Sequence, residues 1–131
     1  MLIALFVLIL LPIAAYRMVR KKQPRHLWSV TGLTFGLVAA PVSLGLYAMF
    51  FVPYVGLVPG MIGLPLSLFH GAPGFEIATV LGLRDARTVV SGNEHLVIEL
   101  INALFWGVVY GVLGFGIDKY RKVRGPNAAK A

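Results

Sequence analysis

A stripe of polar and aromatic side chains recurs at helical spacing towards the C-terminal end of the chain. Its members are His95, Glu99, Asn102, Trp106 and Tyr110, and their spacing places them on one face of a helix. Glu99 is the single acidic residue inside the surrounding apolar run, where a carboxylate is costly and is a functional candidate by default. With His95 one turn away, the stripe suggests a proton relay or part of a metal site.

A structural interpretation of the same stripe competes with this chemistry. Glu99 lies close to the expected start of the helix, where its carboxylate reaches the outer interface, and Asn102 is placed to hydrogen-bond to a neighbouring helix. Two ligands, His95 and Glu99, are too few for a metal site, and His70 supplies a third only if the outer loop folds back. The chain has no cysteine and no nucleophile motif or phosphate loop. We therefore expect no enzyme activity, no catalytic residue, no metal and no cofactor.

Three long apolar blocks position these residues. They run over Met1–Tyr16, Trp28–Val52 and Leu96–Ile117, in a chain of 131 residues that is 58% hydrophobic and 13% charged. Soluble domains carry about a quarter charged residues, and a bilayer core needs about 20 apolar residues per helix. The sequence predicts one all-α integral membrane domain, 1–131, with spans at approximately 1–19, 28–52 and 96–117.

The basic residues set the predicted orientation. Ten of the twelve Lys and Arg residues fall in two segments, the loop 17–27 and the tail 118–131. Basic segments stay cytoplasmic, so we expect the N-terminus outside, the C-terminus inside and contact with anionic lipid headgroups. This explains the net charge of +7 without nucleic acid. The charge asymmetry and small size favour a multi-pass protein of a bacterial inner (plasma) membrane.

The outer segment 53–95 joins the second and third spans. Prolines recur every six residues between Pro53 and Pro65, with glycines between them, and such a run is a poor helix by propensity. A fourth span would place the basic tail outside. We therefore expect a re-entrant or interfacial hairpin over 51–69, followed by a short amphipathic turn that Gly82 ends. A capping box over 91–94 begins the third helix.

Small residues form two further stripes, which predict helix packing. Gly32 and Gly36 share a face of the second span. The third span carries a matching face, made of Ala103, Gly107, Gly111 and Gly114. Small residues allow helices in a membrane to approach closely, so we expect the two faces to touch, within one chain or between chains.

Three functions follow from these patterns. We expect first a non-enzymatic accessory or assembly subunit that packs on a membrane-protein partner through the small-residue faces. The second is a self-associating pore, because three spans with the N-terminus outside and a basic cytoplasmic tail resemble the architecture of class I phage holins; this implies a homo-oligomer with Glu99 and Asn102 lining it. The third is a small transporter or membrane enzyme that uses Glu99 and His95, with the outer segment as a lid.

Overall fold

The computed structural model describes residues 2–22, 24–84 and 92–124; these ranges are helical except for the turns at 52–56 and 81–84, and they contain no strand. The elements, in chain order, are α1 (Leu2–Lys22), η1 (Pro24–His26), α2 (Leu27–Ala48), η2 (Met49–Phe51), α3 (Leu57–Val80) and α4 (Gly92–Arg124). The predicted all-α class is therefore confirmed.

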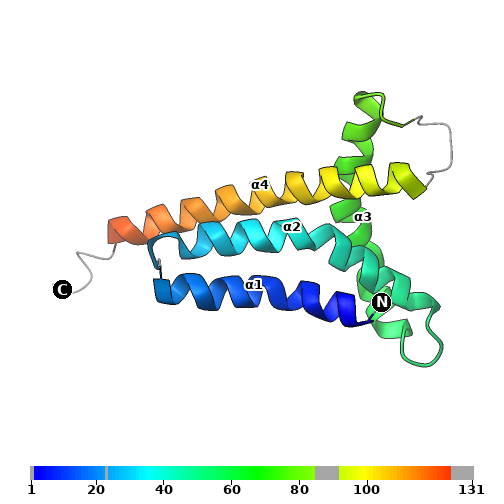
Figure 1. Cartoon of the computed structure of the whole chain (residues 1–131), viewed down its shortest axis with the longest axis horizontal. Coiled ribbons are helices and arrows are strands. Elements are labelled where there is room, and N and C mark those ends of the chain that lie inside the picture. The colour runs from blue at the N-terminus through cyan, green and yellow to red at the C-terminus, as the bar shows by residue number, and fades with distance from the viewer. Residues whose placement is uncertain (1, 23, 85–91, 125–131) are drawn as a thin grey trace.

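Three helices lie side by side and the fourth crosses them. In Figure 1, α1, α2 and α4 run along the long axis of the molecule, and α2 lies between the other two. α3 runs across this direction near the ends of α2 and α4 that are far from the C-terminus. α2 is the central element, because it packs against α1, α3 and α4.

Two of the described helical segments are long and apolar enough to cross a membrane. They are Leu27–Phe51 and Glu94–Lys122, which correspond to the second and third predicted spans. α4 has 33 residues and extends beyond the predicted 96–117 at both ends, and α1 continues past residue 19 to Lys22. At 1.5 Å per residue α4 is about 50 Å long, which exceeds the roughly 30 Å of a hydrocarbon core.

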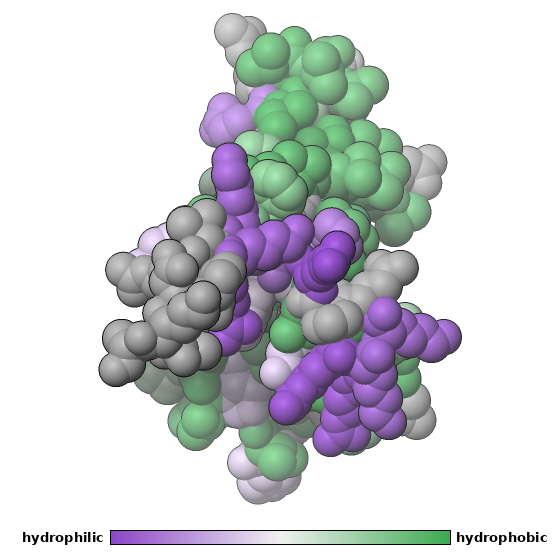
Figure 2. Space-filling model, turned by 90° about the vertical axis from the view of Figure 1, so that its left-hand side faces the viewer, coloured by the Kyte–Doolittle hydropathy of each residue, from purple (hydrophilic) through white to green (hydrophobic). Residues whose placement is uncertain are grey.

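The two basic segments come together at one end of the bundle. The C-terminal turn of α1, η1 and the C-terminal part of α4 meet there, and Figure 2 shows their hydrophilic side chains gathered on this end. The exposed cations include Arg20 and Lys22 of α1, Arg25 of η1 and Arg121 of α4. The opposite end carries the apolar surface of α3.

Glycines bring α2 and α4 into backbone contact within one chain. A Cβ atom at Gly32 would meet the carbonyl of Tyr110, and one at Gly36 would meet the carbonyl of Trp106. From the other side, a Cβ atom at Gly114 would meet the carbonyl of Trp28. The small-residue faces of the two helices therefore pack against each other, and only glycine fits at these three positions.

The hairpin expected over 51–69 is not what the structure shows. α3 is one continuous helix that includes Pro65 and Pro73. Pro59 lies in its first turn, where a missing N–H costs nothing. The glycines that argued against a helix are its contact points, because Gly60 lies against Phe50 and Gly63 against the α2 backbone. Packing thus outweighs the low helix propensity of this segment.

Gly82 ends α3, as predicted, although the helix it ends is far longer than the turn expected there. Its φ of 68° lies in the left-handed region. The Gly82 N–H donates to the Thr79 carbonyl at 3.1 Å, and the Leu83 N–H donates to the Ala78 carbonyl at 2.9 Å. This pair of bonds is the Schellman arrangement. Ser91 of the predicted capping box lies outside the described residues.

Candidate functional site

The polar stripe of α4 faces two different environments. Asn102 and Trp106 are buried and Tyr110 is partly buried, whereas His95 is exposed and Glu99 lies between these extremes. Asn102 has the lowest exposure of any polar residue described, 0%. The structure thus divides the predicted stripe into a buried part, under α3, and an outer part beside a pocket.

Asn102 and Trp106 hydrogen-bond to the backbone of α3. The Gly74 N–H donates to Oδ1 of Asn102 at 2.6 Å, and the indole Nε1–H of Trp106 donates to the His70 carbonyl at 2.9 Å. Gly74 and His70 are four residues apart, so a regular helix would pair these same two backbone groups with each other. Two side chains one turn apart on α4 therefore clamp a single turn of α3, directly at Pro73.

The His70 imidazole joins three helices. Its Nδ1 atom lies 2.8 Å from the Ser43 hydroxyl oxygen of α2 and 3.1 Å from the Leu66 carbonyl oxygen, and its Nε2 atom lies 3.3 Å from the Tyr110 hydroxyl of α4. The exposed fractions of Ser43 and His70 are only 2% and 6%. This histidine is therefore the central polar group of the bundle.

The hydrogen-bond partners assign the proton of this histidine. The Ser43 hydroxyl donates to the Ala39 carbonyl at 2.6 Å, so its oxygen accepts from His70. A carbonyl such as that of Leu66 also accepts only, which places the proton on Nδ1 and leaves Nε2 to accept from Tyr110. A base must instead receive the serine proton. In this arrangement the Ser43–His70 hydrogen bond links α2 and α3.

Aromatic rings enclose the histidine. The Trp106 ring centroid lies 5.0 Å from that of His70, 4.7 Å from that of Phe69 and 5.5 Å from that of Tyr110. Such spacing is typical of favourable ring pairs. We define the central polar cluster as Ser43, His70, Gly74, Asn102, Trp106 and Tyr110. Sequence analysis found its α4 members but not Ser43 or the central role of His70.

Glu99 and His95 line a pocket between α2, α3 and α4. The pocket has a volume of about 360 Å³, and its wall also includes Glu76 and the rings of Tyr47 and Phe75. Glu99 Oε2 is buried without a hydrogen-bond partner among the described residues. No group of three or more potential metal ligands occurs in the described parts of the chain, so His70 does not join His95 and Glu99.

Asp118 caps a helix that is distant in sequence. Its carboxylate accepts from the backbone N–H groups of Trp28 and Ser29, at 3.1 and 2.8 Å, and from the Ser29 hydroxyl at 2.7 Å. These amides belong to the first turn of α2, whose own N-cap residue His26 makes no side-chain cap bond. Sequence analysis assigned Asp118 to the tail 118–131. Its position directly after the apolar run 96–117 is the only sequence signal that could have suggested a buried hydrogen-bond partner.

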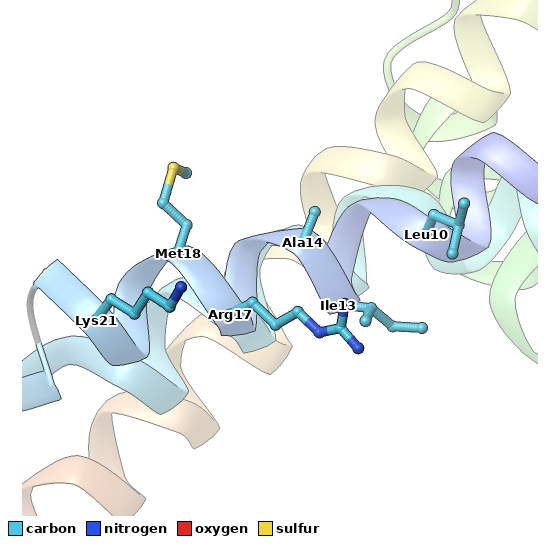
Figure 3. A pocket seen from close by; sticks show the side chains of 6 residues that line it. All are labelled: Leu10, Ile13, Ala14, Arg17, Met18 and Lys21. Carbon is cyan, nitrogen blue, oxygen red and sulfur yellow. The ribbon is translucent and has the colours of Figure 1, made fainter.

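The outward face of α1 carries a broad hollow with no second wall. Figure 3 shows its lining side chains, all of which come from α1 and include Ile13, Arg17, Met18 and Lys21. A hollow formed by one helix encloses nothing, so this open face of apolar side chains and two cations is not a binding site by itself.

The comparisons with known proteins give no relative. No family model matches the chain, and neither a curated protein nor a solved structure matches it.

Proposed function

We propose that the chain is a multi-pass membrane protein of the bacterial inner membrane, in which α1, α2 and α4 are the spans. The side-by-side arrangement of these three helices (Figure 1), with α2 antiparallel to α1 and α4, and the gathering of basic side chains at one end (Figure 2) support this assignment. The positive-inside rule then puts the basic end in the cytoplasm, the start of α1 outside and the end of α4 inside.

In this orientation α3 lies across the outer half of the bundle, as an interfacial or re-entrant element. A helix that lies in the plane of the interface is expected to be amphipathic, with a polar face towards water. α3 instead exposes apolar side chains, including Val58, Met61 and Ile62. Glu76 is the one residue within it from the set Asp, Glu, Lys and Arg. Its outer face therefore favours cover by other apolar groups.

This uncovered face of α3 carries the proposed function, a non-enzymatic accessory or assembly subunit whose outer helix packs on a membrane-protein partner. Large exposed apolar patches mark interaction sites. The small-residue faces of α2 and α4 are occupied by each other, so they hold the bundle together and leave α3 to meet the partner. The Ser43 hydroxyl, which donates to the Ala39 carbonyl, supports a role without catalysis.

The pore alternative receives less support. A pore-lining stripe must face the assembly interior, whereas Asn102 and Trp106 are buried under α3 within one chain. The transporter or enzyme alternative keeps one specific observation in its favour, the pocket that Glu99 and His95 line.

Position-specific photo-crosslinking in native membranes tests the accessory role. A photoreactive residue is placed at Met61 or Ile62 of α3 and, as controls, at Leu104 or Val112 of α4, which are similarly exposed and apolar. Mild-detergent extraction and native mass analysis then identify what is bound. We expect a foreign protein at the α3 positions and lipid at the α4 positions. Lipid alone at all four positions would contradict the proposal, and crosslinks between copies would favour the pore.

A further inference from the structure

A second pocket lies at the basic end of the bundle. It has a volume of about 350 Å³ and is lined by Arg25 of η1 and by Asp118, Arg121 and Lys122 of α4. Its cations thus come from two segments that are almost one hundred residues apart in the sequence. All three cationic side chains are exposed, so their charged groups can reach a ligand.

The one carboxylate of this pocket is already engaged. Asp118 is only 6% exposed, and its two oxygens accept three hydrogen bonds from Trp28 and Ser29 at the start of α2. Its negative charge therefore compensates the positive end of the α2 dipole. The charges of Arg25, Arg121 and Lys122 are therefore not neutralised by Asp118, whose carboxylate is hydrogen-bonded to α2. Three cations around this pocket favour an anionic ligand.

The surroundings place this pocket at the level of a headgroup. The Arg121 guanidinium carbon lies 5.5 Å from the centre of the Trp28 ring, within cation–π range. Tryptophan is enriched at membrane–water interfaces. Tyr16 of α1 packs against the same ring at 6.1 Å. Two interfacial aromatic residues thus stand beside the three cations.

We propose that this pocket binds the phosphodiester of an anionic lipid headgroup, with Arg25, Arg121 and Lys122 as its ligands. Guanidinium groups form paired hydrogen bonds with phosphate oxygens, and lysine adds a point charge. Basic pockets between helices on the cytoplasmic side are suited to such headgroups. The inference rests on the proposed function, because it needs the basic end at the bilayer surface.

Native mass analysis after reconstitution tests the site. The full chain is placed in nanodiscs that contain phosphatidylglycerol and phosphatidylcholine, and the lipid that stays bound after release is counted. The pocket variant is Arg121→Gln with Lys122→Gln. The matched control is Arg17→Gln with Lys21→Gln, which removes two charges from the same end of the molecule on the outward face of α1. Inorganic phosphate is added in a separate arm as a competitor.

We expect the native chain and the control to retain phosphatidylglycerol in preference to phosphatidylcholine. The pocket variant should retain it roughly tenfold more weakly, since it loses the charge-assisted hydrogen bonds that Arg121 and Lys122 would make to the phosphate. An equal loss in the control would overturn the site in favour of general attraction. Displacement of the lipid by millimolar phosphate would assign the pocket to a soluble anion instead. Topology reporters on each variant show separately whether membrane insertion, and hence the proposed function, still holds.

Discussion

The carboxylate of Asp118 caps Ser29 across 89 positions of sequence, accepting from its backbone N–H at 2.8 Å and from its hydroxyl at 2.7 Å. A helix N-terminus leaves its first N–H groups without partners inside the helix, and α2 receives no cap from its own N-cap residue. The C-terminal part of α4 therefore completes the start of α2, which fixes the ends of the two helices relative to each other.

Removal of this cap should destabilise the bundle. Asp118→Ala leaves the partly buried amides of Trp28 and Ser29 without their acceptor, and we expect the free energy of unfolding to fall by about 1–2 kcal/mol. Thermal unfolding in detergent, followed by circular dichroism, measures it. Lys119→Ala, at the adjacent and exposed position, is the control and should change little. Equal effects of both variants would contradict the capping role.

The helices that bury regular small-residue stripes were predictable from sequence, whereas α3 was not. Gly32 and Gly36 are one helical turn apart, so they share one face of the helix whichever helix packs against it. In α3, Pro65 and Pro73 each remove an N–H, and local propensity alone argues for a hairpin. The helix is explained by tertiary contacts, which the local sequence does not reveal. Gly63 lies against α2 and Gly74 lies against α4. Close packing at those points compensates the poor propensity.

The α2–α4 contact should not tolerate even one added methyl group. Gly36→Ala places a Cβ atom against the Trp106 carbonyl, which forces the two helices apart and should cost about 1–3 kcal/mol of unfolding free energy. Gly71→Ala is the matched control, because a Cβ atom there meets nothing within 4 Å; it should leave the stability unchanged or raise it by up to about 1 kcal/mol. Destabilisation by Gly71→Ala but not by Gly36→Ala would refute the packing.

The clamp on α3 should show coupled energetics. Trp106→Phe removes the donor to the His70 carbonyl, and Asn102→Ala removes the acceptor of the Gly74 N–H. Each loss should cost roughly 1–3 kcal/mol, since a buried backbone group loses its partner. A double-mutant cycle on thermal or denaturant unfolding should give a non-zero interaction energy, because both bonds hold the same turn. Strict additivity would show that the two bonds act independently.

Sequence analysis identified one half of this clamp. The spacing of Asn102, Trp106 and Tyr110 predicts a common face, and the structure brings these three residues under α3. Their partners could not be predicted, because His70 and the Gly74 backbone reach them only through the crossing of α3 over α4. The sequence around His70 does not indicate which helix this histidine contacts, and nothing in the sequence marks Ser43 as its partner. Periodicity defines faces within a helix, but not the angle between helices.

The remaining member of the stripe separates the proposed function from its transporter or enzyme alternative. Glu99→Gln keeps the size and shape of the side chain and removes its charge, and Oε2 loses no hydrogen bond by the change because none is formed. We expect insertion and crosslinking of α3 to the partner to persist, and the free energy of unfolding to change by less than about 1 kcal/mol.

Glu76→Gln, at the exposed side of the same pocket, is the control. Growth or transport assays of a deletion strain complemented with each variant provide the readout. If Glu99→Gln abolishes complementation while expression and insertion hold and Glu76→Gln complements, the carboxylate performs chemistry and the accessory role is wrong.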